Sequence, residues 1–103
     1  MNIDWHPGAV EEFLNLEQQL QEKVSTEIEK LTEEGLKWNK VGLVDRPETG
    51  LSCYRLKLVE QGSDLNHRVL FKVIDGNYLI LKVGKRPDFY DLENLEEAKK
   101  RLE

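Results

Sequence analysis

The feature that most constrains the fold is a series of three β-strand patterns in the second half of the chain. Apolar and polar side chains alternate over residues 53–58, which is typical of a strand with one face on a core. Residues 67–74 and 78–83 are rich in β-branched and aromatic side chains. Asp-Gly at positions 75 and 76 separates these two runs and predicts a tight hairpin. Consecutive strands joined in this way predict an antiparallel sheet.

The first half of the chain predicts a short strand and two amphipathic helices. Ile3 and Trp5 alternate with polar neighbours up to the His6-Pro7-Gly8 sequence, which is typical of a turn. Apolar residues then recur at helical spacing, at Val10, Phe13, Leu14, Leu20, Val24, Ile28 and Leu31. A break near residues 15–18 predicts two helices, and Gly35 predicts the end of the second, because glycine readily adopts the left-handed conformation after a helix.

Residues 36–52 show no periodicity and contain two glycines and a proline, which predicts a long loop. After the strand patterns, Pro87 interrupts the chain. A short helix follows, with one apolar face formed by Leu92, Leu95, Ala98 and Leu102. The second half therefore predicts three strands and a C-terminal helix.

The predicted order is β-α-α-β-β-β-α in one domain, residues 1–103. Helices and strands in separate blocks indicate the α+β class. We expect a small, largely antiparallel four-stranded sheet, with the two N-terminal helices packed on one face and a short C-terminal helix. The other face should stay open to solvent.

The formal net charge is −5, which at first disfavours a nucleic-acid ligand. The charge is unevenly distributed, however. Residues 1–50 carry five basic and eleven acidic side chains, and residues 91–103 carry three and five. Residues 51–90 carry seven basic and four acidic side chains. An acidic chain with a basic segment can still focus a local field on an anionic ligand.

The sequence gives little indication of a membrane-spanning segment, a disulfide bond or a metal centre. The N-terminal residues lack the pattern of a secretory signal, and no stretch approaches the roughly 18 apolar residues of a membrane span. We therefore expect a cytoplasmic protein with no membrane contact. Cys53 is the only cysteine and is interpreted as a small residue of the sheet. His6 and His67 are far apart in the sequence, and their neighbours favour turn and strand roles over catalysis.

The basic segment places cations at regular positions on the predicted strands. Arg55 and Lys57 project to one side, because neighbouring side chains along a strand point to opposite faces. The other cations of the segment are Arg68, Lys72, Lys82, Lys85 and Arg86. If they converge, they form a cradle for phosphates and for the extra negative charge of a phosphoryl transition state. Cations on an open sheet face are equally common as solvated edge protection, and spacing alone does not decide between the two.

Tyr90 follows Arg86 by four residues. It could anchor the last helix, or it could act as a general base if cations lowered its ordinary pKa of about 10. RNA cleavage requires removal of the 2'-hydroxyl proton, stabilisation of the phosphorane and protonation of the 5'-oxygen, and none of these steps demands a metal. The sequence contains neither a metal-ligand cluster nor a phosphate-binding glycine loop, so we expect no metal and no cofactor.

Taken together, these segments resemble the RelE branch of the RelE/ParE toxin superfamily. The resemblance lies in the order and spacing of residues 53–58, 67–73 and 83–86 and of Tyr90, and it extends over nearly the whole chain. It implies the toxin of a type II toxin-antitoxin system. The implied activity is a metal-independent endoribonuclease that cuts mRNA in the ribosomal A site through attack of the 2'-hydroxyl.

The resemblance also implies roles for individual residues. Arg55 and Lys57 match a basic pair that grips the phosphate, and Arg68 matches an arginine of the next strand. Arg86 matches an arginine that stabilises the transition state or assists the leaving oxygen, and Tyr90 matches an aromatic residue that stacks on or deprotonates the substrate. We expect these five to be catalytic, and the cations that support RNA binding to be Lys72, Lys82 and Lys85.

The implied partners are mRNA, the ribosome and a cognate antitoxin that covers the basic face. The implied assembly is either a homodimer or a toxin-antitoxin hetero-oligomer. The chain departs from the family in its acidic net charge, in Arg55 where lysine is common, and in the length of residues 36–52. Two alternatives remain open: a ParE-like inhibitor of DNA gyrase, and a catalytically inactive module that binds only the antitoxin.

Overall fold

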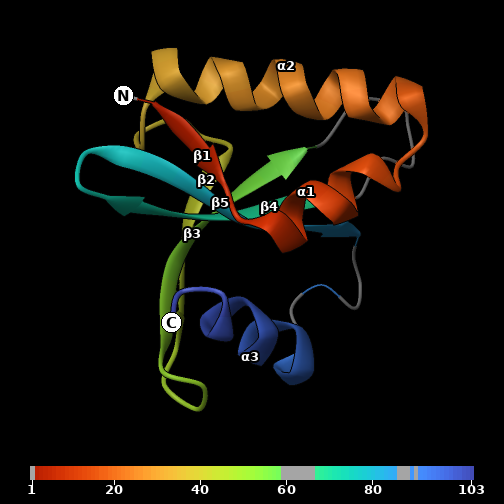
Figure 1. Ribbon diagram of the computed structural model, residues 1–103. Coiled ribbons are helices and arrows are strands. Elements are labelled where there is room, and N and C mark those ends of the chain that lie inside the picture. The colour runs from red at the N-terminus through yellow and green to blue at the C-terminus, as the bar shows by residue number, and fades with distance from the viewer. Residues whose placement is uncertain (1, 59–66, 86–88, 90) are drawn as a thin grey trace.

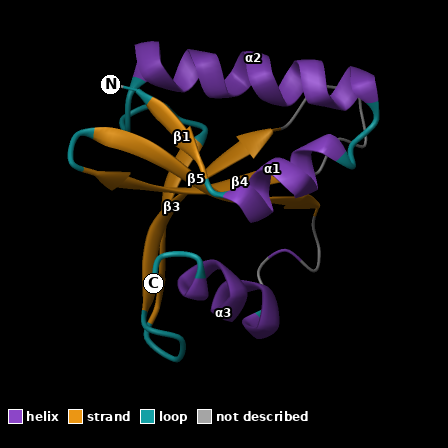
Figure 2. Ribbon diagram, in the orientation of Figure 1, coloured by secondary structure: helices purple, strands orange, loops and turns teal. Residues whose placement is uncertain are grey.

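The computed structural model describes residues 2–58, 67–85, 89 and 91–103, except for the side chain of Leu92. The elements are β1 (Ile3–Trp5), α1 (Pro7–Leu14), α2 (Gln18–Glu34), β2 (Val41–Arg46), β3 (Leu51–Leu58), β4 (His67–Ile74), β5 (Asn77–Lys85) and α3 (Leu92–Lys100). Figure 1 shows α1 and α2 on one side of the sheet and α3 on the other, beside β3. The same arrangement, coloured by element type, is shown in Figure 2.

The five strands are ordered β1-β5-β4-β3-β2. The β1 strand runs parallel to β5, and the other neighbouring pairs are antiparallel. The predicted α+β class, the two N-terminal helices and the short C-terminal helix are confirmed. The predicted count of four strands was wrong, because β2 lies within residues 36–52, where the sequence predicted a loop.

The sequence did not predict β2, because β2 is an edge strand whose stability depends on its pairing with β3. Its residues pair with β3 from Val41 opposite Leu56 to Arg46 opposite Leu51. Only Val44 is buried in the strand, and Leu43 is 63% exposed. Backbone pairing therefore stabilises β2 without the alternating apolar pattern by which strands are recognised in a sequence.

The ends of α1 and α2 follow from local chemistry. Nδ1 of His6 accepts a hydrogen bond of 2.9 Å from the backbone N–H of Gly8, and Pro7 begins α1, where its missing N–H costs nothing. The predicted break is confirmed between Leu14 and Gln18. Gly35 ends α2 as predicted, but its φ of 73° and ψ of −171° differ from the left-handed helical conformation that was expected.

The predicted hairpin between β4 and β5 is also confirmed. Ile74 pairs with Asn77, so the connection contains two residues. Asp75 and Gly76 have φ values of 52° and 79°. Positive φ at both positions is typical of a type I' turn, whose twist matches that of the flanking strands.

The central strand β4 is buried on both faces. Val69 and Phe71 pack toward α1 and α2, whereas Leu70 packs toward α3, and all three are fully buried. The core on the first side also contains Ala9, Val24, Ile28, Leu31, Leu56, Leu58, Tyr78, Ile80 and Val83. The core on the second side contains Val44, Leu51, Cys53, Leu81, Phe89, Leu95 and Ala98. The second face is therefore covered in part, whereas the sequence predicted that it would be open.

An ionic cluster joins α1, β5 and α3, and we define it as Glu12, Lys82, Glu97 and Arg101. Lys82 Nζ lies 2.9 Å from a carboxylate oxygen of both Glu12 and Glu97. Arg101 donates to the same two carboxylates at 2.8 and 2.6 Å. The cluster also supplies hydrogen-bond partners to backbone groups of β5: the Glu12 carboxylate accepts from the N–H of Val83, and Arg101 donates to the carbonyl oxygen of Leu81.

The position of Lys82 corrects the prediction that it binds RNA. Its side chain is 7% exposed and lies between two carboxylates. The register pairs Lys82 with Leu70, but its ammonium group is occupied by Glu12 of α1 and Glu97 of α3. Lys82 therefore stabilises the packing of the helices against β5.

The ionic cluster should stabilise the fold at neutral pH. Burial alone would raise the pKa of Glu12, but hydrogen bonds from Arg101 and Lys82 outweigh it and lower that pKa below its ordinary value. A hydrogen bond from Lys82 lowers the pKa of Glu97. A carboxylate with a lowered pKa contributes stability above its unfolded pKa of about 4.5, and this stability is lost as the pH falls through the folded value.

We predict that Glu12→Gln lowers the free energy of unfolding by about 2 kcal/mol at pH 7, because it leaves Lys82 and Arg101 with one carboxylate fewer. The difference from wild type should shrink toward pH 3, where Glu12 is increasingly protonated in the wild type. Urea unfolding at both pH values measures this. The control is Glu22→Gln, on the exposed side of α2, with a change of less than about 0.5 kcal/mol. A Glu12→Gln protein as stable as wild type at pH 7 would contradict the prediction.

Candidate nucleic-acid interface

Three cations occupy one end of the sheet face on which α3 packs. Lys57 of β3 lies directly opposite Arg68 of β4, and Arg55 lies opposite Leu70. Leu70 belongs to the core under α3, so side chains of the same alternation face the same side. We call Arg55, Lys57 and Arg68 the cation face. The sequence predicted that Arg55 and Lys57 share a face and left their convergence with Arg68 open, and the strand register places all three on one face.

The guanidinium group of Arg55 lies against the backbone of β2. Gly42 pairs with Arg55, and a Cβ atom built on Gly42 would lie 2.8 Å from the Cζ and Nη2 atoms of Arg55. Nη1 of Arg55 is buried and has no hydrogen-bond acceptor within the described residues. A buried N–H group without an acceptor is unfavourable, so this nitrogen is suited to an anionic ligand.

Lys57 and Arg68 place two positive charges side by side. Arg68 is 4% exposed, and its Nη1 donates a hydrogen bond of 2.9 Å to the carbonyl oxygen of His67. Like charges at directly opposed strand positions repel each other. Guanidinium and ammonium groups bind phosphate oxygens well.

The chain after β5 returns to the same end of the sheet. Gly84 lies opposite Arg68, and the ring of Phe89 packs so closely on Gly84 that an added Cβ would approach it within 2.5 Å. Lys85 is exposed at the end of β5. The predicted catalytic residues Arg86 and Tyr90 lie outside the described residues; in the sequence they follow Lys85 and Phe89 directly.

Lys72 lies apart from the cation face. It is on β4, four residues from Arg68, and its Nζ donates a hydrogen bond of 2.8 Å to the carbonyl oxygen of Ser52. That bond places the ammonium group near the Cys53 end of β3, where α3 covers the sheet. The structure therefore brings Arg55, Lys57 and Arg68 together, but not Lys72 or Lys82.

His67 and Cys53 have the structural roles that the sequence favoured. His67 is 7% exposed in β4, and burial, with repulsion from Lys85 and Arg68, lowers its pKa below the ordinary value of 6.5. Its imidazole is therefore neutral at neutral pH. Cys53 is buried in β3, and burial raises the pKa of its thiol to about 11, so the thiol stays protonated.

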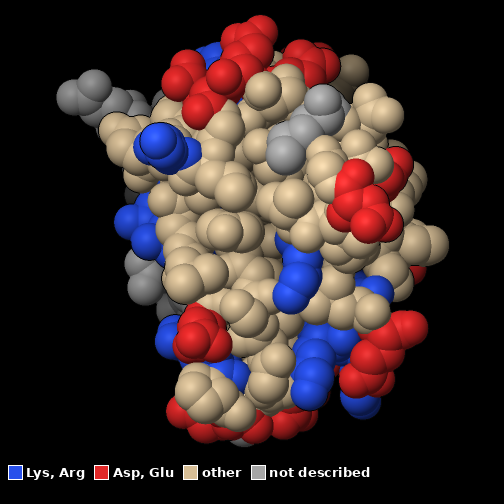
Figure 3. All heavy atoms as spheres, turned by 90° about the vertical axis from the view of Figure 1, so that its left-hand side faces the viewer, with Lys and Arg blue, Asp and Glu red and all other residues tan. Residues whose placement is uncertain are grey.

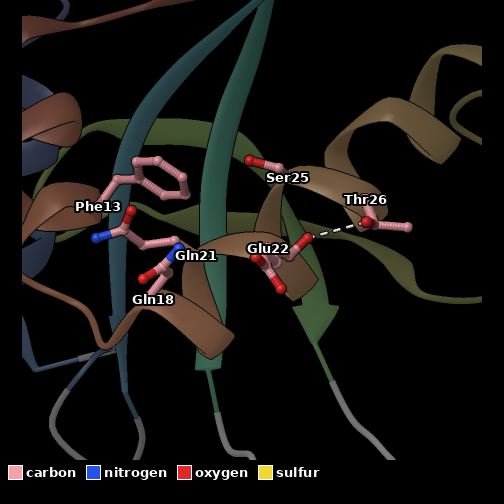
Figure 4. Close-up of a pocket in the computed structure, with 6 residues that line it drawn as sticks. All are labelled: Phe13, Gln18, Gln21, Glu22, Ser25 and Thr26. Atoms are coloured by element: carbon pink, nitrogen blue, oxygen red, sulfur yellow. Dashed lines mark hydrogen bonds between the residues drawn. The ribbon is translucent and has the colours of Figure 1, made fainter.

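A separate hollow lies against the helices that cover the opposite face of the sheet. It encloses about 490 Å³ and is lined by Phe13, Gln18, Gln21, Glu22, Ser25 and Thr26, as Figure 4 shows. Its lining is uncharged apart from Glu22, so it offers no cation to a phosphate. Within residues 2–58, 67–85, 89 and 91–103, no three His, Cys, Asp or Glu side chains are grouped to hold a metal ion.

Sequence reasoning missed Gly42 and Gly84, whose missing side chains make room for Arg55 and Phe89. It also missed Glu12 and Arg101. The acidic side chains of the N-terminal helices, which include Glu12, were interpreted as solvated, and no role was predicted for Arg101 at the end of α3. A glycine in a strand that pairs with an arginine is the signal for Gly42, but it requires knowledge of the pairing. The ionic cluster had no signal, because its residues are up to 89 positions apart.

Comparison with known proteins identifies the fold. No protein-family model and no curated protein matches the sequence. Among solved structures, a free-state mutant of the E. coli toxin RelE has a TM-score of 0.68 and 20% identity, and the match covers 99% of this chain and 97% of that one. The isolated E. coli RelE toxin has a TM-score of 0.61 and 24% identity, with 99% and 98% covered.

More distant organisms contain the same architecture. RelE in the RelE-RelB complex of Pyrococcus horikoshii has a TM-score of 0.62 and 21% identity, and the match covers 82% of this chain and 93% of that one. The YoeB dimer of Staphylococcus aureus has a TM-score of 0.58 and 20% identity, with 84% and 98% covered. The chain therefore has the RelE-like fold that the sequence predicted. None of the described helices combines the length and apolar character needed to cross a membrane.

We predict that His67 titrates below pH 6.5 and makes folding sensitive to acid. Because its folded pKa is lower than its unfolded pKa, the unfolded state binds more protons between the two values. The contribution of His67 to stability is complete above pH 6.5 and is lost as the pH falls through the folded pKa. NMR titration of the imidazole should give a higher pKa in Lys85→Gln, which removes a repelling charge, and no change in the control Lys72→Gln. A folded pKa of 6.5 or more in the wild type would contradict this.

Proposed function

We propose that the protein is the toxin of a type II toxin-antitoxin system and that it cleaves mRNA, in the ribosomal A site, without a metal ion. The observation that carries the proposal is the convergence of Arg55, Lys57 and Arg68 on one end of the sheet, with a buried Arg55 nitrogen that lacks an acceptor in the described part of the chain. The RelE-like fold supports it, because similar solved chains include the E. coli toxin RelE.

The cation face supplies what cleavage of a phosphodiester requires. Arg55 and Lys57 hold the phosphate, and Arg68 balances the charge that develops on its oxygens. The 2'-oxygen attacks the neighbouring phosphorus, and the bond from phosphorus to the 5'-oxygen breaks. The products are a 2',3'-cyclic phosphate and a 5'-hydroxyl.

Two proton transfers complete the reaction, and we assign groups of the segment that follows β5 to them. The proton of the 2'-hydroxyl passes to Tyr90, or to water if Tyr90 stacks on the base. Arg86 stabilises the transition state, and the departing 5'-oxygen takes a proton from Arg86 or from water. Lys85, exposed at the end of β5, supports RNA binding. The burial of Arg68 strengthens its electrostatic effect, because water screens it less.

The acidic net charge is compatible with this proposal because the acidic side chains are unevenly distributed. Figure 3 shows acidic side chains gathered at the top of one face, where α2 runs, and acidic and basic side chains together lower down. The cation face is on the other side of the sheet from α2. A cluster of cations in a partly covered site raises the local concentration of an anionic ligand even when the net charge is negative.

We further propose a cognate antitoxin as the partner and the cytoplasm as the compartment. Support comes from similar solved structures that are RelE-RelB complexes, from E. coli and from Pyrococcus horikoshii. The antitoxin would contact the cation face and block access of RNA. The expected assembly is a toxin-antitoxin hetero-oligomer.

Cleavage of translated mRNA tests the proposal. The protein is purified away from its antitoxin and added to a translation extract, and cut sites are mapped with and without a chelator. We predict cuts that persist in chelator, and a loss of rate of about 100-fold or more in Arg68→Ala, Arg86→Ala and Tyr90→Phe. The control Lys30→Ala removes an exposed cation of α2, on the other side of the sheet from the cation face, and should keep the rate within about twofold.

Two outcomes would contradict the proposal. One is an absence of cuts, or cuts unaffected by all three substitutions. The other is inhibition of DNA gyrase supercoiling by the wild type without RNA cleavage, which would support the ParE-like alternative.

A further inference from the structure

We infer that Gly42 is the positioning residue that holds Arg55 ready for a phosphate of RNA. The inference rests on the proposed function in one respect, the identity of the ligand. Gly42 is in the middle of β2, directly opposite Arg55 of β3. It touches Arg55 and not the substrate, so its effect on RNA must act through the arginine.

The backbone at position 42 does not itself require glycine. The described glycines with positive φ are Gly35, Gly50 and Gly76, and Gly42 is not among them. Glycine inside a strand weakens it, because the unfolded chain loses more freedom and no side chain packs. The structural reason for Gly42 is therefore the space above it, which the Arg55 guanidinium occupies.

That space is tightly bounded. A Cβ on Gly42 would lie 2.8 Å from Cζ and Nη2 of Arg55 and 3.0 Å from Nε, closer than non-bonded atoms approach. Val44, the next residue on the same side of β2, is 5% exposed and belongs to the core under α3. Any side chain at position 42 must therefore displace the guanidinium from the strand.

The position of the Arg55 guanidinium against Gly42 has a chemical consequence. A guanidinium group is a planar fork that binds the two oxygens of a phosphate when its orientation is fixed. Against the β2 backbone the group loses rotational freedom before any ligand arrives, which lowers the entropic cost of binding. Nη1 is buried there with no acceptor among the residues described. A lysine has no such fork, which gives a reason for arginine at position 55.

A double-mutant cycle tests whether Gly42 acts through Arg55. The probe is a 2'-O-methyl RNA oligonucleotide, which lacks the attacking hydroxyl and cannot be cleaved, and its Kd is measured by fluorescence anisotropy. We predict that Gly42→Ala weakens binding about tenfold, the effect of misplacing one charged hydrogen-bond donor. In an Arg55→Ala background, Gly42→Ala should weaken binding no further. Leu43→Ala is the control, because Leu43 is exposed on the other face of β2.

A second measurement needs no RNA. The Nε–H signal of Arg55 is followed by NMR in wild type and in Gly42→Ala, together with the thermal stability of each protein. We predict a shifted, faster-exchanging signal in Gly42→Ala, and a smaller loss of stability from Gly42→Ala when Arg55 is already alanine.

The outcomes separate the two proposals. An unchanged Arg55 signal, or an equal loss of RNA binding in both backgrounds, overturns the role of Gly42. Suppose that the wild type neither binds nor cleaves RNA, but that the Arg55 signal still depends on Gly42. This result overturns the proposed function and establishes that Gly42 positions Arg55.

Discussion

The structure depends on the burial of β4 from both sides. Val69, Leu70 and Phe71 are consecutive and fully buried, and their side chains alternate between the two faces, so each face of the sheet must be covered by a helix there. Apolar burial of this kind is the largest favourable contribution to folding. The α1 and α2 helices pack on one face, and α3 packs on part of the other. The remaining part is where β3 and β4 can present cations.

The function proposed for the protein follows from this incomplete cover. Strand register, rather than a flexible loop, sets Lys57 beside Arg68, and β2 fixes Arg55 through Gly42. Rigid strands position charged groups more precisely than loops do. The ionic cluster around Lys82 holds α1 and α3 to β5, and so fixes the helices that border the cation face.

The sequence predicted those parts of the fold that have a regular apolar period. The helices, the hairpin at Asp75 and Gly76, and the shared face of Arg55 and Lys57 all follow from spacing. It missed β2, because Gly42 was interpreted as an interruption in a loop when it is a strand residue that makes room for a side chain. It counted Lys82 among the RNA-binding cations, because the pairing of Lys82 with Glu12 and Glu97 joins residues far apart in the sequence. Packing across strands is the information that spacing lacks.

The central claim is that RNA binds the end of the sheet that α3 leaves uncovered. NMR mapping of backbone amides during titration with an uncleavable 2'-O-methyl RNA oligonucleotide tests it most directly. The account predicts that the largest shifts occur at Arg55, Lys57 and Arg68, with little change at Gln21 and Ser25 in the hollow against the helices. Shifts confined to that hollow or to α2, or none at all, would contradict it.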